Sequence, residues 1–158
     1  MFLIILRCII IPTSLDVIRT EGETIMQDYI KSSLDYIEKN LKTEIKTAEL
    51  ANMTGYFVTH YYRLFNKVTG LSVANYISKR RINHALFEIL AGRKVIDAVL
   101  EYGFDTYAGF YKAFVKMYGC SPMKYLTIYK NLTPKEMENI LMNYNLTEEQ
   151  INKIIERW

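Results

Sequence analysis

Few side chains in this sequence have the type and spacing that catalysis or metal binding requires. The two cysteines, Cys8 and Cys120, are too few and too far apart for a disulfide framework or a four-ligand zinc site. His60 and His84 have neither metal-ligand spacing nor an acidic cluster around them, which favours helix-surface or core imidazoles. The sequence also contains no glycine-rich phosphate loop and no nucleophile elbow. We therefore expect no enzyme activity, no metal and no cofactor, in a reduced, cytoplasmic protein.

The charged side chains offer a different chemistry, the binding of an anion. The 158 residues carry 20 Lys and Arg against 17 Asp and Glu, a net charge of only +3. The excess is confined to residues 56–130, which have 11 basic and 4 acidic residues, whereas the segments before and after each carry a net charge of −2. This middle segment also holds most of the 13 tyrosines and all but one of the 7 phenylalanines. Such a segment indicates a polyanion-binding surface, with ordinary solvated helix faces as the alternative.

Helices must position these side chains, because apolar residues recur at helical spacing and no sustained alternation typical of strands appears. Glycines and capping residues divide the pattern into segments. It predicts a first helix ending near residue 40 and further helices over about residues 47–54, 58–67, 72–90, 95–102, 107–118 and 122–129. The predicted fold class is all-α.

Two of these helix pairs repeat one another. Aligning Phe65 with Phe114 places a glycine five residues after each, at Gly70 and Gly119. The same alignment pairs Arg63 with Lys112, Tyr62 with Tyr111, Tyr61 with Phe110, and Gly55-Tyr56 approximately with Gly103-Phe104. A short helix, a glycine turn and a second helix are typical of a helix-turn-helix unit, and the sequence predicts two of them.

The two ends of the chain differ from this middle. The apolar run over residues 1–11 is shorter than the roughly 20 residues of a membrane-spanning helix, and Arg7 interrupts it. The codons for Glu21-Gly22-Glu23 can contain a bacterial ribosome-binding sequence, which would lie just before the codon for Met26. We therefore interpret residues 1–25 as a leader that is not translated. The alternative is that they form an amphipathic arm. At the other end, the sequences after Thr133 and Thr147 form two capping boxes, which predict a helical hairpin over residues 131–158.

The middle of the chain resembles the DNA-binding domain of AraC/XylS-type transcription regulators, over roughly residues 29–125. The residues that carry the resemblance are Gly55-Tyr56, Tyr62-Arg63-Leu64-Phe65-Asn66-Lys67 and Thr69-Gly70-Leu71-Ser72 in the first copy, then Glu101-Tyr102-Gly103-Phe104-Asp105, Phe110-Tyr111-Lys112-Ala113-Phe114 and Tyr118-Gly119-Cys120-Ser121-Pro122 in the second. The resemblance implies a domain over residues 26–130, with helix-turn-helix units at about 47–68 and 95–118 joined by a linker helix at about 72–90. It also implies that each unit inserts a recognition helix into one of two successive major grooves of double-stranded DNA. The linker helix, about 27 Å long at 1.5 Å per residue, suits a spacing of one DNA turn, about 34 Å.

The family's base-contacting positions transfer to Thr59, Tyr62 and Arg63 on the first recognition helix and to Tyr107, Ala108, Tyr111 and Lys112 on the second. Within each copy three of them share one helix face at i, i+3 and i+4 spacing. Lys67 and Lys116, one turn further on, are expected to contact phosphates. Arg63 is the candidate for a bidentate contact to guanine.

The sequence departs from the family pattern at the ends of the recognition helices. Phe57 stands where a Ser or Thr usually caps the first, which predicts the loss of about 1 kcal/mol at that end. Gly109 lies inside the second, at a cost of about 1 kcal/mol relative to Ala. Sensory domains of the family have no counterpart here, so a monomer or weak dimer is expected, with RNA polymerase as the partner that the resemblance implies. A non-enzymatic helical protein-interaction module, or the DNA-binding remnant of a longer regulator, is the alternative.

Overall fold

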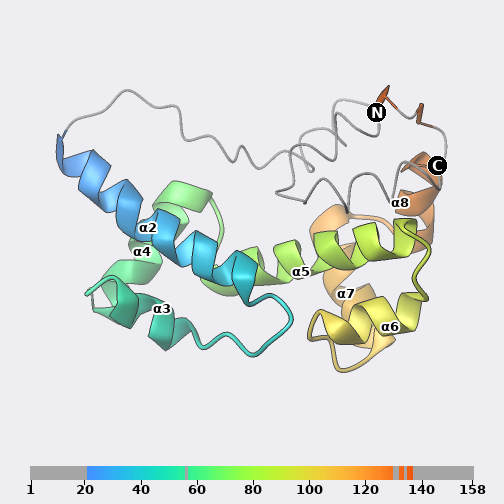
Figure 1. Cartoon of the computed structure of the whole chain (residues 1–158), viewed down its shortest axis with the longest axis horizontal. Coiled ribbons are helices and arrows are strands. Elements are labelled where there is room, and N and C mark those ends of the chain that lie inside the picture. Colours follow the sequence, from blue (N-terminus) through green and yellow to red (C-terminus); the bar gives the residue numbers. More distant parts are fainter. Residues whose placement is uncertain (1–20, 56, 130–131, 134, 137–158) are drawn as a thin grey trace. The chain divides into compact units, whose positions relative to one another are not determined.

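Helices are the only regular elements in the part of the chain that the computed structural model describes, which comprises residues 21–55, 57–129, 132–133 and 135–136 (Figure 1). The predicted all-α class is therefore confirmed. In order, the helices are α2 (Glu21–Lys39), α3 (Thr47–Met53), α4 (Val58–Thr69), α5 (Val73–Leu90), α6 (Val95–Glu101), α7 (Tyr107–Tyr118) and α8 (Pro122–Tyr129). From α3 onward their bounds agree with the sequence-based ones to within about two residues.

The chain divides into two compact units, and α5 contributes to both. The N-terminal unit ends at Asn83, and the C-terminal unit begins at His84. α2 begins at Glu21 and runs through Met26 without a break. Residues 21–25, which the sequence analysis placed in the N-terminal extension, are thus helical, and the rest of that extension lies outside the described residues.

The core of the N-terminal unit forms where α2 and α3 pack against α4. Ile30 and Ile37 of α2 are fully buried, and so are Tyr61 and Phe65 of α4. Phe65 meets Tyr76 of α5 edge-on, with ring centroids 5.4 Å apart at 84°. Full burial of each such side chain stabilises the folded unit by about 1.5–3 kcal/mol. The face of α4 that carries Tyr61 and Phe65 therefore points into the core.

A buried ion pair joins α2 to α5 inside this unit. Nε and Nη2 of Arg80 donate to the two carboxylate oxygens of Glu38 at 2.6 and 2.7 Å. The side chains are 5% and 17% exposed. One of the basic residues of the middle segment is therefore neutralised within the fold, which the charge count alone did not reveal.

The C-terminal unit is built in the same way around α7. α6 packs against α7, and α7 packs against α8. Phe110 and Phe114 of α7 are fully buried, and Phe114 meets Tyr125 of α8 edge-on at 5.4 Å and 79°. His84 stacks on Tyr102 with ring centroids 5.7 Å apart, so this imidazole has the structural role that the sequence analysis favoured.

The internal repeat is confirmed in detail. α3 and α6 have 7 residues each, and α4 and α7 have 12 each. The ring pair Tyr61–Phe65 is 5.8 Å apart at 52°, and the equivalent pair Phe110–Phe114 is 5.7 Å apart at 51°. Both recognition helices end at a left-handed glycine, Gly70 at φ 70° and Gly119 at φ 71°, a conformation that costs other residues energy. The helix that follows begins with a serine cap in each copy, because Ser72 and Ser121 accept from the N–H of Asn75 and Lys124, both at 3.3 Å.

The first of the two predicted capping boxes in the C-terminal segment is also present. Oγ1 and the backbone N–H of Thr133 donate to the Glu136 carboxylate at 2.7 and 2.8 Å, and the Glu136 N–H donates back to Oγ1 at 3.4 Å. These hydrogen bonds lower the pKa of the Glu136 carboxyl, the Thr133 hydroxyl most of all. The rest of the predicted hairpin, including the second box after Thr147, lies outside the described residues.

Candidate nucleic-acid interface

The first recognition helix, α4, has one buried and one exposed face. Tyr61, Leu64 and Phe65 point into the core. All four site residues predicted on this helix are exposed: Thr59, Tyr62, Arg63 and Lys67. The helix contains no acidic residue, so its exposed face offers hydrogen-bond donors and positive charge with no built-in repulsion toward an anion.

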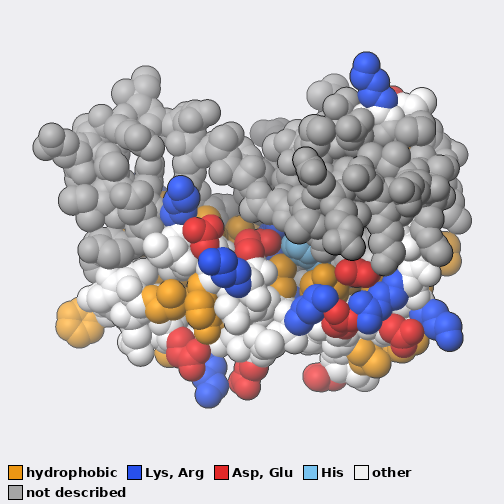
Figure 2. Space-filling model, viewed as in Figure 1, with side chains coloured by type: hydrophobic (Ala, Val, Ile, Leu, Met, Phe, Trp, Pro, Cys, Tyr) orange, Lys and Arg blue, Asp and Glu red, His pale blue; other side chains and the backbone are white. Residues whose placement is uncertain are grey.

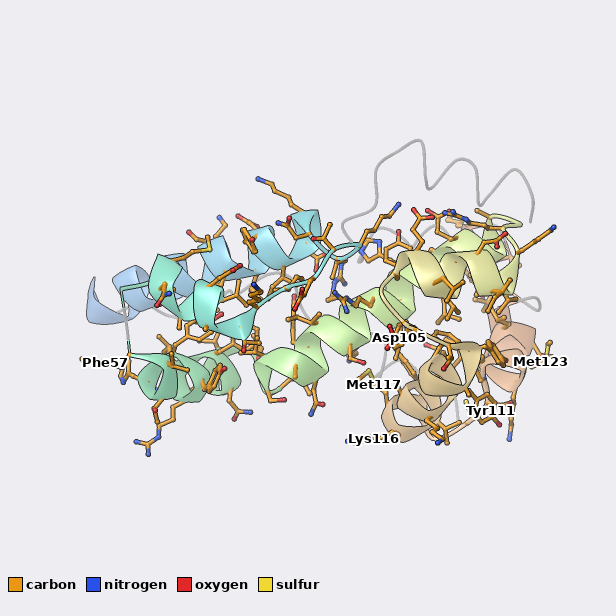
Figure 3. The ribbon with its side chains drawn as sticks, turned by 90° about the horizontal axis from the view of Figure 1, so that it is seen from below. Phe57, Asp105, Tyr111, Lys116, Met117 and Met123 are labelled. Carbon is orange, nitrogen blue, oxygen red and sulfur yellow. The ribbon has the colours of Figure 1, made fainter. Side chains whose placement is uncertain are left out.

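The second recognition helix, α7, presents the equivalent face with a different composition. Its predicted site residues are all exposed as well: Tyr107, Ala108, Tyr111, Lys112 and Lys116. Tyr107 and Tyr111 are 42% and 41% exposed, and their ring centroids lie 6.3 Å apart. Figure 3 shows Tyr111 and Lys116 on α7. Like α4, α7 has no acidic residue, but its surface is more aromatic and carries Lys112 at the position where α4 has Arg63.

The four basic residues of these faces remain available to a ligand. Within the described residues, Arg63, Lys67, Lys112 and Lys116 form no ion pair. In contrast, Arg93 is paired with Glu101 and lies 3.7 Å from Glu88. Basic and acidic side chains lie close together on the face that Figure 2 shows. The availability of the helix cations therefore comes from their specific positions on α4 and α7 and not from a uniformly basic surface.

The N-terminal ends of the two helices differ as the sequence predicted. The N-cap of α4 is Phe57, which provides no side-chain hydrogen bond and is 90% exposed, at the outer end of the helix (Figure 3). The N-cap of α7 is Thr106, whose Oγ1 accepts from the Gly109 N–H at 3.1 Å. A Cβ on Gly109 would lie 3.3 Å from that oxygen. The tight fit at the cap gives Gly109 a local role within the helix.

One contact at this surface was missed by the sequence analysis. The Tyr62 hydroxyl is hydrogen-bonded to Oγ1 of Thr47 at 2.8 Å, which links the two helices of the first helix-turn-helix unit. The sequence pattern predicts only that Thr47 begins the shorter helix. The two residues are 15 positions apart on different helices, so helical periodicity carries no signal for their contact.

The segment that contains α4 and α7 is similar to known proteins. Residues 50–128, which contain both recognition helices, match the family model described as a helix-turn-helix domain. The chain belongs to the AraC/XylS family. The resemblance found in the sequence is thereby confirmed.

Relatives of this AraC/XylS chain match it over its helix-turn-helix region. The HTH-type transcriptional activator AarP of Providencia stuartii is 36% identical over 97 residues, which are 61% of this chain and 72% of AarP. The Transposon Tn10 TetD protein of Escherichia coli is 35% identical over 97 residues, 61% of this chain and 70% of TetD. The uncharacterized HTH-type transcriptional regulator YbfP of Bacillus subtilis (strain 168) is 32% identical over 113 residues, 71% of this chain. The chain spans only 38% of the length of YbfP.

A solved structure supports the fold. A protein of unknown function from Listeria innocua superposes with a TM-score of 0.53 at 26% identity, over 63% of this chain and 95% of that one. None of the helices in the described part of the chain is long and apolar enough to cross a membrane. No group of three or more His, Cys, Asp or Glu residues suited to a metal ion occurs there either.

Proposed function

We propose that this AraC/XylS chain is a sequence-specific regulator of transcription that binds double-stranded DNA through α4 and α7. The observation that carries the proposal is the duplication. Two helices of equal length, each without an acidic residue, expose equivalent faces of basic and hydroxyl-bearing side chains. Side chains of these types bind phosphates and base edges, and a recognition helix of this size fits the major groove.

The two helices enter successive major grooves in this proposal. Arg63 donates two hydrogen bonds to a guanine, and Lys112 takes the equivalent position in the second groove. The other residues on these faces contact bases by hydroxyl groups or by apolar contact with thymine methyls, and they are Thr59, Tyr62, Tyr107, Ala108 and Tyr111. Lys67 and Lys116 contact phosphates and fix the register.

The cellular setting follows from DNA as the target. We place the protein in the bacterial cytoplasm, acting as a monomer or weak dimer, with RNA polymerase as the partner through which it alters transcription. No step of this action breaks or forms a covalent bond, so the proposed role is not enzymatic.

The test combines substitution with salt titration. Arg63→Ala is expected to weaken binding to the preferred site by about 1–3 kcal/mol and to relax the preference at one base pair. Lys116→Ala is expected to weaken all sequences alike and to reduce the dependence of log K on log salt by about one unit. If Arg63→Ala binds every sequence as the parent does, the role given to Arg63 is wrong.

A helical protein-interaction module is the second candidate, because α6 exposes two large apolar side chains one turn apart. Ile96 is 45% exposed and Leu100 is 47% exposed. An interface built on them would gain little from low salt, since apolar burial is not screened by ions. Binding to DNA must instead weaken steeply as salt rises. A salt-independent interaction with a protein, with no affinity for duplex DNA, would favour this second function.

A further inference from the structure

The hydrogen bond between Thr47 and Tyr62 joins the two helices of the first helix-turn-helix unit at its surface. Thr47 is the first residue of α3, and Tyr62 is the fifth residue of α4. Their side-chain oxygens are 2.8 Å apart. We propose that Thr47 is a positioning residue for DNA recognition, which holds the Tyr62 side chain in its base-reading orientation before DNA arrives. This inference rests on the proposed function, and it concerns a residue outside both recognition helices.

Tyr62 lies at an exposed position, where a side chain without a partner keeps its rotamer freedom. A partner is therefore needed to hold it in one orientation. Its side chain is 39% exposed, and its ring lies beside that of Tyr61 with centroids 6.0 Å apart at 53°. Tyr61 is itself fully buried. The Tyr62 ring therefore rests against a fixed neighbour, and its hydroxyl end is held by Thr47. A side chain ordered in advance loses less conformational entropy on binding, which is how preorganisation increases affinity.

The bond to Thr47 does not use up the hydrogen-bonding capacity of Tyr62. Each hydroxyl has one proton and two lone pairs, and a single bond between two hydroxyls consumes one proton and one lone pair. Whichever oxygen donates, the Tyr62 oxygen keeps at least one free site for a base edge. The contact with Thr47 and a contact with DNA can therefore exist together.

The second unit provides an internal comparison. Val95 is the first residue of α6, and Tyr111 is the fifth residue of α7, so they occupy the positions of Thr47 and Tyr62. Valine has no hydroxyl, and the Tyr111 ring lies instead beside Tyr107. The two units thus carry the same tyrosine on the recognition helix but hold it by different means. A hydroxyl removed at residue 47 should therefore affect the reading of DNA by the first unit alone.

The experiment uses the full chain and a duplex that the parent protein selects from a random library. Tyr62→Ala first identifies the base pair at which Tyr62 contributes to selection. Thr47→Val, which removes the hydroxyl at nearly constant volume, is then expected to weaken binding to that duplex about two- to tenfold, the worth of one hydrogen bond. It should also flatten the preference at the Tyr62 base pair. Thr47→Ser keeps a hydroxyl and should restore both.

Double-mutant cycles separate positioning from general stability. Thr47→Val and Tyr62→Phe should be strongly non-additive, because each removes the same bond. Thr47→Val and Tyr111→Phe should be additive, because Tyr111 belongs to the other helix-turn-helix unit. The proposal is overturned if Tyr62→Ala relaxes no base pair, or if Thr47→Val lowers the melting temperature while every base preference is kept. Tighter binding by Thr47→Val would also overturn it, since Thr47 would then hold Tyr62 away from DNA. A parent protein that selects no duplex refutes the proposed function itself.

Discussion

Restoring a side-chain cap to the first recognition helix should stabilise the protein. The backbone at Phe57 already has N-cap geometry, with ψ 140° and its carbonyl accepting from the Tyr61 N–H at 3.0 Å. The equivalent carbonyl of Thr106 accepts from the Phe110 N–H at 3.1 Å. The two N-cap residues differ in φ, which is −59° at Phe57 and −146° at Thr106, and only Thr106 provides a side-chain acceptor. Phe57→Ser places a hydroxyl oxygen where it can accept from the N–H of the third helical residue, as Thr106 does from Gly109.

The size of the effect can be worked out from exposure. An N-cap Ser contributes about 1 kcal/mol relative to a residue that cannot cap. Because Phe57 is 90% exposed, the burial lost with its ring is worth only about 0.3 kcal/mol, a tenth of the value for a fully buried side chain. The net gain in unfolding free energy is about 0.7 kcal/mol, which raises the melting temperature by about 1.5–3 °C in a chain of this size.

Thermal and urea denaturation followed by circular dichroism measure this gain, with two control variants. Phe57→Ala removes the ring without adding an acceptor and should lower stability slightly. Thr106→Ala removes the existing cap of α7 and should lower the unfolding free energy by about 1 kcal/mol. If Phe57→Ser is no more stable than Phe57→Ala while Thr106→Ala is destabilised, the reasoning about the first cap is wrong.

Two further predictions concern buried groups in the two units. Glu38→Gln leaves the buried Arg80 guanidinium without its countercharge and should lower the free energy of unfolding in urea by about 3 kcal/mol. Arg93→Ala breaks an ion pair in which the Arg93 side chain is 37% exposed, and it should lower the free energy of unfolding by less than about 1 kcal/mol. Equal costs would contradict the difference in burial. At alkaline pH, burial raises the pKa of Tyr76 and of Tyr102 to about 12, so the unfolded chain ionises first. The contribution of each tyrosine to the free energy of unfolding is complete below pH 10 and should fall by about 2–3 kcal/mol between pH 10 and about 12. Urea unfolding across this pH range measures the loss, and tyrosinate absorbance follows the titration. Tyr76→Phe should reduce this loss; an unchanged pH profile in that variant would refute the assignment.

The fold was largely predictable from the sequence because local signals agreed with one another. Glycines such as Gly70 and Gly119 mark helix ends through the backbone conformation that they permit. Apolar spacing identified the buried faces, and Phe65 and Phe114 defined the repeat. The site residues were placed by transferring the family's base-contacting positions to this sequence, and all of them are exposed.

What the sequence did not predict depends on contacts between distant residues. Glu38 and Arg80 are 42 positions apart, and Thr47 and Tyr62 are 15 apart, on helices whose relative register no periodic pattern encodes. The functional meaning of a cation therefore depends on the fold. Arg80 belongs to the core and Arg93 to a local ion pair, whereas Arg63 remains available to a ligand.

Selection of preferred sites from random duplex DNA tests most directly the claim that both units read bases. The parent protein is expected to enrich two short motifs with centres about one helical turn, 10–10.5 base pairs, apart. Arg63→Ala should relax one motif, and Lys112→Ala should relax the other. Enrichment of a single short motif, unaffected by one of these substitutions, would contradict the claim that α4 and α7 both act as recognition helices.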